Sequence, residues 1–496
     1  METSVPAFFF ALLAFLWYLF SSLRAKKGPP SPLALPLIGH LHLLGNLPHQ
    51  NLQKLSKKYG PIMSIKLSFT PAIVISSPEY AELFLKTHDA VFASRPHLQI
   101  SQYLSYNHKN LVYAEYGQFW RNIRKLCTIE LLSASKIDSF KPMRREEVTE
   151  FVVSVKKIAD SASEMNVTAK IESLIEGMTY RMLFGSKNKY DFKTGLQEAI
   201  SLLGHFNIAD YISWLEPFDL QGMIRRIKAI SKVLDANLEE IIDEHARDAQ
   251  KLQGKHRDFV DMMLSLMDSN KYNTRELQLD RDYIKAIMLD MIGASIDTTS
   301  TTVEWTIAEA LKNPRVMKLI QEELENVVGL DRMVEETDLP KLDYLNMVIN
   351  ESMRLHPVLP LLIPHESTED VTVNGYFIPK KSRVLVNTWA IGRDPHVWSD
   401  NVEEFYPERF SGSKIDVQGH DFQLLPFGSG RRKCPGMQLG LTVVQLVLAQ
   451  LFHCFKLDLP IGMSAENLDM TEKFGLTLPR ASHLTAIPSY RLQTNV

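Results

Sequence analysis

Cysteine is scarce in this sequence of 496 residues, which contains only Cys127, Cys434 and Cys454. An odd and sparse set argues against a disulfide framework and suits a reducing compartment, in which thiols stay free. An excess of either charge is also missing, since 55 basic residues stand against 58 acidic ones. A nucleic-acid partner usually requires a basic surplus, so none is expected.

Internal repeats and low-complexity tracts are absent, as are linkers rich in Pro, Gly or Ser after residue 45. Chain length alone would suggest about three domains, but without linkers we expect one large folded body over 46–496. A hydrophobic share of 45% with 23% charged residues is typical of a globular protein rather than a disordered one.

Charge is also absent between Thr3 and Leu23, where residues 5–20 form an almost wholly apolar run. A membrane-spanning helix needs about 20 apolar residues and tolerates about 17, so this segment is just long enough. A cleaved signal peptide is the alternative, but no charged region precedes the run and no small-residue cleavage site follows it. Basic residues follow it instead, which favours a cytoplasmic body. We therefore expect a membrane anchor with its basic flank over 1–27 and a stiff, proline-rich hinge over 28–45.

The remaining chain combines mostly amphipathic helical segments with a few short strands, which predicts a mainly α fold with small β-sheets. The strand-like segments lie at 62–67, 72–76, 371–373, 376–378 and 383–387. Asn374 and Gly375, between the third and fourth of these, are the strongest short signal for a β-hairpin. We expect the fifth segment to belong to the same small sheet as that hairpin.

One predicted helix is unusually long. Asp280 suits its N-cap, and Asn313 followed by Pro314 should end it after Lys312. A helix of about 30 residues spans roughly 45 Å and must cross the whole molecule. Its middle, residues 293–302, reads GASIDTTSTT, a run of weak helix formers that invites a functional explanation.

The most specific motif is the loop at 426–436, which reads PFGSGRRKCPG. It fits the spacing F-x-x-G-x-R-x-C-x-G through Phe427, Gly430, Arg432, Cys434 and Gly436. Glycines let the backbone turn tightly beside a flat ligand, and the basic residues before the cysteine favour its thiolate. A helix starting just after Pro435 would favour the thiolate further, because the positive end of its dipole would lie near the sulfur. A cysteine thiolate is a known ligand of haem iron, whereas a phosphate-binding loop would need a preceding strand and a closing G-K-[ST].

This loop resembles that of the cytochrome P450 family, in the form typical of plant microsomal members. Further family motifs occur in order along residues 28–496, so the resemblance covers nearly the whole chain. It implies the cytochrome P450 fold and a thiolate-ligated haem b, with Cys434 as the ligand to the iron. Glu351 and Arg354 match the family's E-x-x-R, and Arg409 matches the arginine that joins them. The family implies that these three support the haem-binding core.

Other matches imply contacts with the haem. Trp120 and Arg124 match W-x-x-x-R and share one face of a helix, where arginine can offer a bidentate fork to a propionate. His365 and Arg432 match further positions that contact propionates. Phe427 and Gly436 belong to the ligand loop itself.

Residues 294–299, ASIDTT, resemble the family's A-G-x-[DE]-T-T. An acid followed by a hydroxyl can relay protons in a dry pocket, which makes Asp297 and Thr298 the candidates for catalysis. The alternative is that these hydroxyls bond back to the helix and merely bend it. Ser295 stands where the family usually has glycine, and we expect it to narrow the oxygen groove and to add a hydroxyl there.

The resemblance implies a membrane-bound monooxygenase that hydroxylates a small apolar plant specialised metabolite, such as a terpenoid or a simple phenolic, with O2. Electrons would come from NADPH through NADPH–cytochrome P450 reductase, because the chain carries no dinucleotide fingerprint. Cytochrome b5 is a further candidate partner. A single-pass position in the endoplasmic reticulum membrane with a cytosolic catalytic domain is expected.

By the same resemblance, four stretches should line the substrate pocket. They are His97–Tyr113, Met291–Thr298, Val358–Ile363 and Phe474–Thr477. Two alternative functions remain: a haem-thiolate isomerase or dehydratase that needs neither O2 nor a reductase, and a non-catalytic haem-binding protein. The acid–threonine pair at 297–298 argues against both, because neither requires proton delivery to oxygen.

Overall fold

The computed structural model describes residues 27–187, 192–248, 258–269, 271–272, 278–399 and 401–494. The anchor expected over 1–27 lies outside the described residues, except for Lys27. Among the described residues, α18 (Met437–Cys454) is the helix long and apolar enough to cross a membrane. Most of it is buried in the core, as in a soluble protein.

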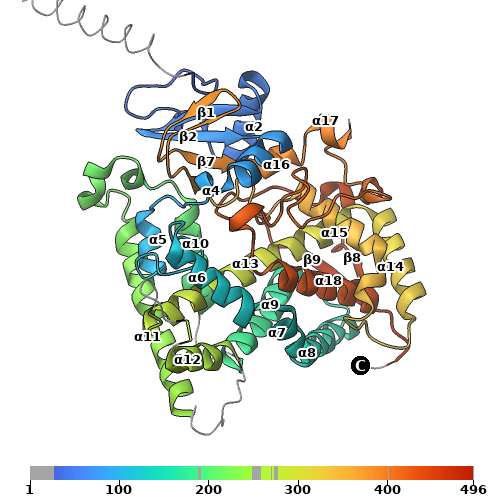
Figure 1. Cartoon of the computed structure of the whole chain (residues 1–496). Helices are drawn as coiled ribbons and strands as arrows, with labels where there is room; N and C mark the ends of the chain where they lie inside the picture. Colours follow the sequence, from blue (N-terminus) through green and yellow to red (C-terminus); the bar gives the residue numbers. More distant parts are fainter. Residues whose placement is uncertain are drawn as a thin grey trace, which may run out of the picture.

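Helices make up most of the fold, as predicted, and the largest of the small sheets lies at one end of the molecule (Figure 1). The first helices are α2 (Pro48–Tyr59), α3 (Pro78–Glu82), α4 (Asp89–Phe92), α5 (Gln99–Leu104), α6 (Gln118–Leu126), α7 (Ala134–Ser139), α8 (Lys141–Asp160) and α9 (Val167–Phe184). They are followed by α10 (Phe192–Gly204), α11 (Met223–Asp248), α12 (Phe259–Ser269), α13 (Arg281–Lys312), α14 (Pro314–Val328), α15 (Asp343–Leu355), α16 (Thr388–Ile391), α17 (Pro395–Trp398) and α18.

The strands form three small sheets. Their bounds are β1 (Ile62–Leu67), β2 (Thr70–Ile75), β3 (Met165–Asn166), β4 (His365–Glu366), β5 (Val371–Val373), β6 (Tyr376–Ile378), β7 (Arg383–Val386), β8 (Phe455–Asp458) and β9 (Thr485–Tyr490). The sheet orders are β1-β2-β7-β4, β3-β9-β8 and β5-β6. The predicted hairpin is therefore confirmed as β5-β6.

The expected place of β7 was wrong. This strand pairs in parallel with β2 and antiparallel with β4, rather than with the hairpin next to it in the sequence. All four of its residues are buried, as in an internal strand that is covered on both faces. A two-stranded hairpin offers no such cover, so the strand lies in the larger sheet.

The long helix α13 runs through the middle of the molecule, as its length requires (Figure 1). Its bounds are those predicted: the side chain of Asp280 accepts a hydrogen bond from the backbone N–H of Tyr283, and the helix ends at Lys312. It packs against α9, α15 and α18. The largest apolar core cluster lies between these helices and also includes α8 and α14.

The side chains of Glu351, Arg354 and Arg409 meet, as the motifs implied. Arg354 donates from Nε to Glu351 Oε2 at 2.7 Å and from Nη2 to Oε1 at 2.8 Å, while Arg409 Nε reaches Oε1 at 2.9 Å. The remaining guanidinium N–H groups donate to backbone carbonyls between 392 and 404. This buried network therefore fixes α15 to the segment that leads into the cysteine loop.

Replacing Arg409 with methionine should lower the free energy of unfolding by about 3 kcal/mol, because it leaves part of the buried Glu351 charge without a partner. Arg315→Met is the matched control, since Arg315 forms an exposed pair with Glu408 nearby and should cost less than about 1 kcal/mol. Urea denaturation followed by tryptophan fluorescence measures both. Equal losses would contradict a supporting role for the buried network.

Candidate functional site

The cysteine loop is shaped by close backbone contacts. The N–H of Cys434 donates to the carbonyl of Phe427 at 2.9 Å, and α18 begins three residues later with Gly436 as its N-cap. Gly430 has φ +66°, and a Cβ there would lie 2.1 Å from the carbonyl oxygen of Leu85. Only glycine fits at this position, so the loop presents Cys434 at the start of α18 in a fixed conformation.

The charges around Cys434 differ from those expected. Burial raises the pKa of its thiol, and the backbone N–H of Gly436, Arg124 and Lys433 oppose this effect. Arg431 was expected to help but is paired with Asp89 at 2.7 Å. Without a metal, burial outweighs the nearby cations. A bound cation reverses that balance, because a thiol that coordinates it is deprotonated.

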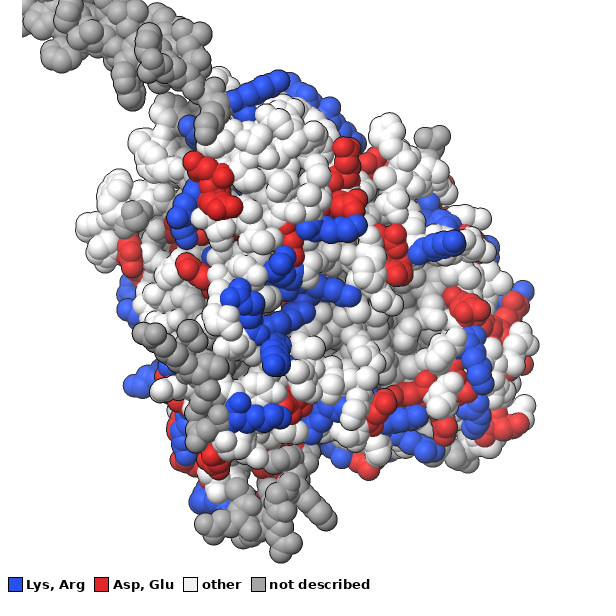
Figure 2. Space-filling view, viewed as in Figure 1, with Lys and Arg blue, Asp and Glu red and all other residues white. Residues whose placement is uncertain are grey.

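Basic side chains gather near the middle of the face in Figure 2, over the region of α6 and of the loop before α18 in Figure 1. Arg121 and Lys125 lie one turn apart on α6 and are both exposed. Arg431 is exposed on the loop and Lys433 is half-buried. A positive surface therefore lies beside the cysteine loop, although Arg431 is partly neutralised by Asp89.

Arginines without acidic partners lie beneath this surface. Arg432 donates to the carbonyls of Ala93 at 2.6 Å and Ala114 at 2.5 Å. Burial, Arg95 and Arg124 lower the pKa of Arg432 to about 8. Among the described residues no carboxylate forms an ion pair with any of these three arginines, although burying uncompensated charge is expensive. This cluster fits the two carboxylates of a haem, which would supply the missing negative charge.

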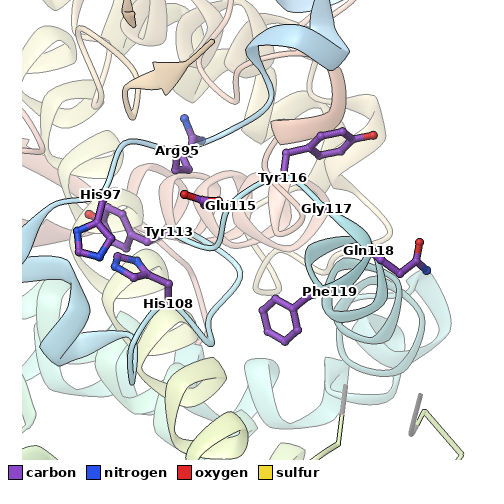
Figure 3. Close-up of a pocket in the computed structure, with 9 residues that line it drawn as sticks. All are labelled: Arg95, His97, His108, Tyr113, Glu115, Tyr116, Gly117, Gln118 and Phe119. Atoms are coloured by element: carbon purple, nitrogen blue, oxygen red, sulfur yellow. The ribbon is translucent and has the colours of Figure 1, made fainter. Parts of the chain in front are cut away.

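Arg95 was not identified from the sequence, where it occurs as a lone arginine in a loop. It is 6% exposed, donates from Nη1 to the carbonyl of Pro364 at 2.9 Å, and has no hydrogen bond at Nε. Figure 3 shows it at the edge of a cleft of about 530 Å³ that is also lined by His97, His108, Tyr113, Glu115 and residues 116–119. Arg95 therefore joins the residues that could hold a propionate.

Two residues predicted to contact the haem propionates, Trp120 and His365, each direct a ring nitrogen to a backbone carbonyl. The indole N–H of Trp120 donates to the carbonyl of Leu111 at 3.0 Å, and its ring lies 4.3 Å from the guanidinium of Arg432. Trp120 thus orients Arg432. His365 is buried, and one ring nitrogen lies 2.8 Å from the carbonyl of Phe92. Burial, followed by Arg95, holds the pKa of His365 well below its usual range.

On α13 the hydroxyls form the backbone contacts that the alternative interpretation described. Thr298 donates to the carbonyl of Ala294 at 2.5 Å, and Thr302 donates to that of Thr298 at 2.9 Å. Ala294 is nevertheless exposed, although it lies in the middle of a helix that crosses the molecule. Residues four apart share a face, so Ala294 and Thr298 lie on the same side of α13, where the oxygen groove is expected. Donation to a carbonyl leaves the hydroxyl of Thr298 able to accept a proton.

The hydroxyl of Ser295 does not enter that groove, which corrects the expectation. Its Oγ lies 3.0 Å from Thr179 Oγ1 on α9 and 3.3 Å from the carbonyl of Ile292. Thr179 in turn donates to the carbonyl of Ile175. The hydroxyl of Ser295 therefore bonds across the contact between α9 and α13. It joins the two helices and adds no polar group beside Thr298.

Asp290 on α13 holds residues 97–113, the first predicted wall of the substrate pocket, named here its roof. The sequence did not identify this acid. Its carboxylate accepts from Asn110 Nδ2 at 2.6 Å and from the backbone N–H groups of Leu111 at 2.8 Å and Val112 at 3.2 Å. Burial raises the pKa of Asp290 to about 7 against these three donors. The only sequence signal is an acid in an apolar stretch of α13, which does not identify its partners.

The polar side chains of the roof form hydrogen bonds mainly with backbone groups. Ser101 is fully buried and donates to the carbonyl of Leu98, and Ser105 accepts from the N–H of His108. In the other walls, Leu362 has φ +50° and lies against Gly428 of the cysteine loop, while the ring of Phe474 stacks on His49 of α2. Leu362 is therefore the predicted wall residue that lies directly beside the cysteine loop.

A cysteine loop packed at the start of α18 and neighbouring, largely covered arginines without acidic partners are the features expected of a haem-thiolate protein. The family model for cytochrome P450 matches residues 29–485, and the chain belongs to this family of haem-thiolate oxidoreductases. Membership implies monooxygenase chemistry with O2, a hydrophobic substrate and a redox partner.

Individual relatives agree along nearly the whole chain. Cytochrome P450 CYP736A12 of Panax ginseng is 55% identical over 495 residues, which cover 98% of this chain and 99% of the relative. Germacrene A hydroxylase of Saussurea costus is 41% identical and covers 94% of both chains. A zebra fish cytochrome P450 solved with abiraterone has a TM-score of 0.75 and 27% identity, with 90% of this chain and 100% of that one covered.

Removing the hydroxyl of Ser295 should lower stability and leave catalysis intact, because it joins α13 to α9. We expect Ser295→Ala to lower the free energy of unfolding by about 1 kcal/mol and Ser295→Gly by about 1 kcal/mol more. Product formed per NADPH should stay unchanged in both variants. If Ser295→Ala lowered that ratio, the hydroxyl would have a role in the groove after all.

Proposed function

We propose that this protein is a membrane-bound monooxygenase that hydroxylates a small apolar plant metabolite, with electrons delivered from NADPH by a separate reductase. Cys434 is the proposed thiolate ligand, and the observation that carries the proposal is its position in a glycine-shaped loop beside a cluster of buried and half-buried arginines that lack carboxylate partners. The haem iron, when bound, supplies oxygen activation, which a thiolate ligand favours.

The arginine cluster would hold the cofactor. Arg95, Arg124 and Arg432 offer guanidinium donors to the propionates, which are the anions this cluster lacks. Trp120 keeps Arg432 in place through its ring, and His365 adds a ring nitrogen on the same side. Phe427 and Gly436 shape the loop around the cysteine.

Asp297 and Thr298 are the proposed proton relay. Burial and the nearby Glu172 raise the pKa of Asp297, so it can exchange a proton closer to neutral pH than an exposed aspartate. No described residue forms a hydrogen bond with Oδ1 of Asp297, which allows water to reach that atom. Because no hydrogen bond joins the side chains of Asp297 and Thr298, a water molecule must carry the proton between them.

The substrate class follows from the lining of the pocket. Its charged groups are engaged elsewhere: Asp290 with the roof and Asp297 with Thr477. A carboxylate or phosphate would find no partner in these two acids, and burying an unpaired charge is prohibitive. Apolar walls bind by removing apolar surface from water, at about 25 cal/mol per Å². The relative named germacrene A hydroxylase supports a terpenoid within this class.

The expected endoplasmic reticulum location is supported by exposed apolar side chains. Leu33, Leu37 and Phe69 are 87%, 70% and 62% exposed, and a hydrogen bond from the N–H of Ser68 to the carbonyl of Ile38 joins their segments. Trp214 and Phe218, on the loop after α10, are 69% and 66% exposed. That loop contacts the same sheet through Tyr211, which packs beside β1 and β2.

Together these side chains form an apolar surface close to the start of the described chain, suited to a membrane interface. Residues 166–168, Asn-Val-Thr, match the N-glycosylation pattern, and Asn166 is exposed. A cytosolic body would leave this asparagine without a glycan. Mass spectrometry of the protein from its plant host tests this orientation, and a glycan on Asn166 would contradict it.

Replacing Cys434 with alanine should abolish the carbon monoxide difference band of a thiolate-ligated haem, together with all NADPH-dependent turnover. Cys454→Ala is the matched control, because Cys454 is buried at the other end of α18 and should leave the band in place. Absorption spectra of the reduced proteins decide between them. A Cys434→Ala protein that kept the band would refute the assignment of the ligand.

Reversing charges on α6 should slow electron delivery if the basic surface docks an acidic reductase. With Arg121→Glu and Lys125→Glu combined, we expect the rate to fall roughly tenfold at low ionic strength and much less at high salt, since steering is screened. Arg225→Glu with Lys232→Glu, exposed positions on α11, is the control. A loss that did not depend on salt, or an equal loss in the control, would count against docking at α6.

Enlarging Leu362 to phenylalanine should change the ratio of hydroxylated products, or lower turnover, without changing the haem spectrum. Both residues have the same backbone strain at φ +50°, so the variant tests side-chain volume alone. Product analysis by mass spectrometry after incubation with candidate terpenoids measures the change. Preferred turnover of a nucleotide or a sugar phosphate would overturn the proposed substrate class.

A further inference from the structure

A hydroxyl from a distant segment binds the carboxylate of Asp297. Thr477 Oγ1 donates to Asp297 Oδ2 at 2.5 Å, although the two residues are 180 positions apart. Thr477 is 7% exposed, so water does not compete freely for this bond. The proposed relay acid is therefore held by a residue from a predicted substrate wall.

The segment that carries Thr477 is anchored on both sides. The N–H of Leu478 donates to the carbonyl of Val358 at 2.9 Å, and the carbonyl of Leu478 accepts from the indole N–H of Trp305, also at 2.9 Å. Trp305 lies on α13, about two turns beyond Asp297. The segment is thereby held against the helix that it bonds to.

The end of α10 touches the same segment. A Cβ at Gly204 would lie 2.3 Å from the backbone nitrogen of Leu476 and 2.6 Å from the carbonyl carbon of Gly475. These backbones therefore meet with no side chain between them. This close backbone packing fixes the position of Thr477. The place of its hydroxyl therefore does not depend on the side-chain rotamer alone.

The charged groups around Asp297 would otherwise favour its protonated form. Glu172 on α9 acts in the same direction as burial and raises the pKa of Asp297, and it is paired at 2.5 Å with Lys193 on α10. Glu304, farther along α13, accepts from Thr168 and lies 3.7 Å from Arg480. The hydroxyl of Thr477 opposes burial and Glu172, because its hydrogen bond stabilises the charged carboxylate.

We propose that Thr477 is a positioning residue that holds the Asp297 carboxylate in its ionised form and directs its other oxygen toward the relay. This inference rests on the relay role proposed above for Asp297. With Oδ2 bound by Thr477, Oδ1 is the atom that takes up a proton from water and passes it on toward Thr298. Substrate seated against residues 474–477 would keep the hydroxyl on Oδ2, which links occupation of the pocket to proton supply.

The first test reads the carboxyl directly and needs no turnover. Difference infrared spectroscopy across a pH series follows the C=O band of protonated Asp297, which is assigned by its absence in Asp297→Asn. In Thr477→Val the titration of this band should move up by about 1 to 2 pH units, because a hydrogen bond to a charged group is lost. Thr477→Ser should restore the original titration. Thr471→Val, which removes an exposed threonine–aspartate bond to Asp469, is the matched control and should change nothing.

The second test is the pH profile of product formed per NADPH. It should move in the same direction in Thr477→Val, with the missing product replaced by hydrogen peroxide, and return in Thr477→Ser. An unchanged infrared titration in Thr477→Val would overturn the proposal. A Thr477→Ser protein that behaved like the valine variant would do so as well, because a merely structural role depends on shape and not on the hydroxyl.

Failure of the relay itself is distinguishable. If Asp297→Asn keeps its full product yield, the proposed catalytic role of Asp297 is wrong whatever the infrared band does. If Asp297→Asn forms peroxide while Thr477→Val leaves band and profile unchanged, the role of Thr477 alone is wrong. If Thr477→Val folds poorly, the same substitution is tested in the Asp297→Asn variant. Valine should cause no further loss of product there if the two residues act as a pair.

Discussion

Placing the buried Arg95 and the half-buried Arg124 and Arg432 near one another without an acidic partner costs free energy that the polypeptide alone does not offset. Their N–H groups are partly satisfied by backbone carbonyls, yet carbonyls bring no net charge. A cofactor with two carboxylates and a metal, bound as proposed at Cys434, would compensate both the cations and the thiol. Binding of the haem must therefore contribute to folding stability, because a ligand that binds only the folded chain stabilises it.

The helix α13 is the second element on which the site depends, because its side chains bond to the roof and to the segment at 474–478. Asp290 holds the roof, Ser295 is fastened to α9, Asp297 reaches the segment at 474–478, and Trp305 anchors that segment again. Farther along, Glu309 accepts from His356 at 2.7 Å, next to the buried Glu351 network. The weak helix formers in its middle are tolerated because tertiary contacts, and not intrinsic propensity, hold the helix.

Local patterns predicted much of this arrangement. Capping and breaking residues marked the bounds of α13, an Asn-Gly pair marked the hairpin, and glycine spacing marked the cysteine loop. Each of these signals lies within a few residues of the structure that it specifies. The motif resemblance also predicted that Glu351, Arg354 and Arg409 interact, and their side chains do meet.

What the sequence could not predict depends on partners far along the chain. The parallel pairing of β7 with β2, the roof bonds of Asp290 and the bond from Thr477 to Asp297 join segments separated by more than a hundred residues. Arg95 has no pattern around it, and the direction of the Ser295 hydroxyl is decided by Thr179 on another helix. Such contacts are properties of the packed chain, so no local spacing encodes them.

At Gly204 the end of α10 lies directly against the backbone of residues 475–476. Immediately after Gly204, the chain continues into the loop whose tryptophan and phenylalanine are exposed. A displacement of that loop would therefore be passed through α10 to residues 475–476, and from there to the hydroxyl on Asp297. A change at the outer surface of the protein is thus connected, through a short series of direct contacts, to the half-buried acid at 297.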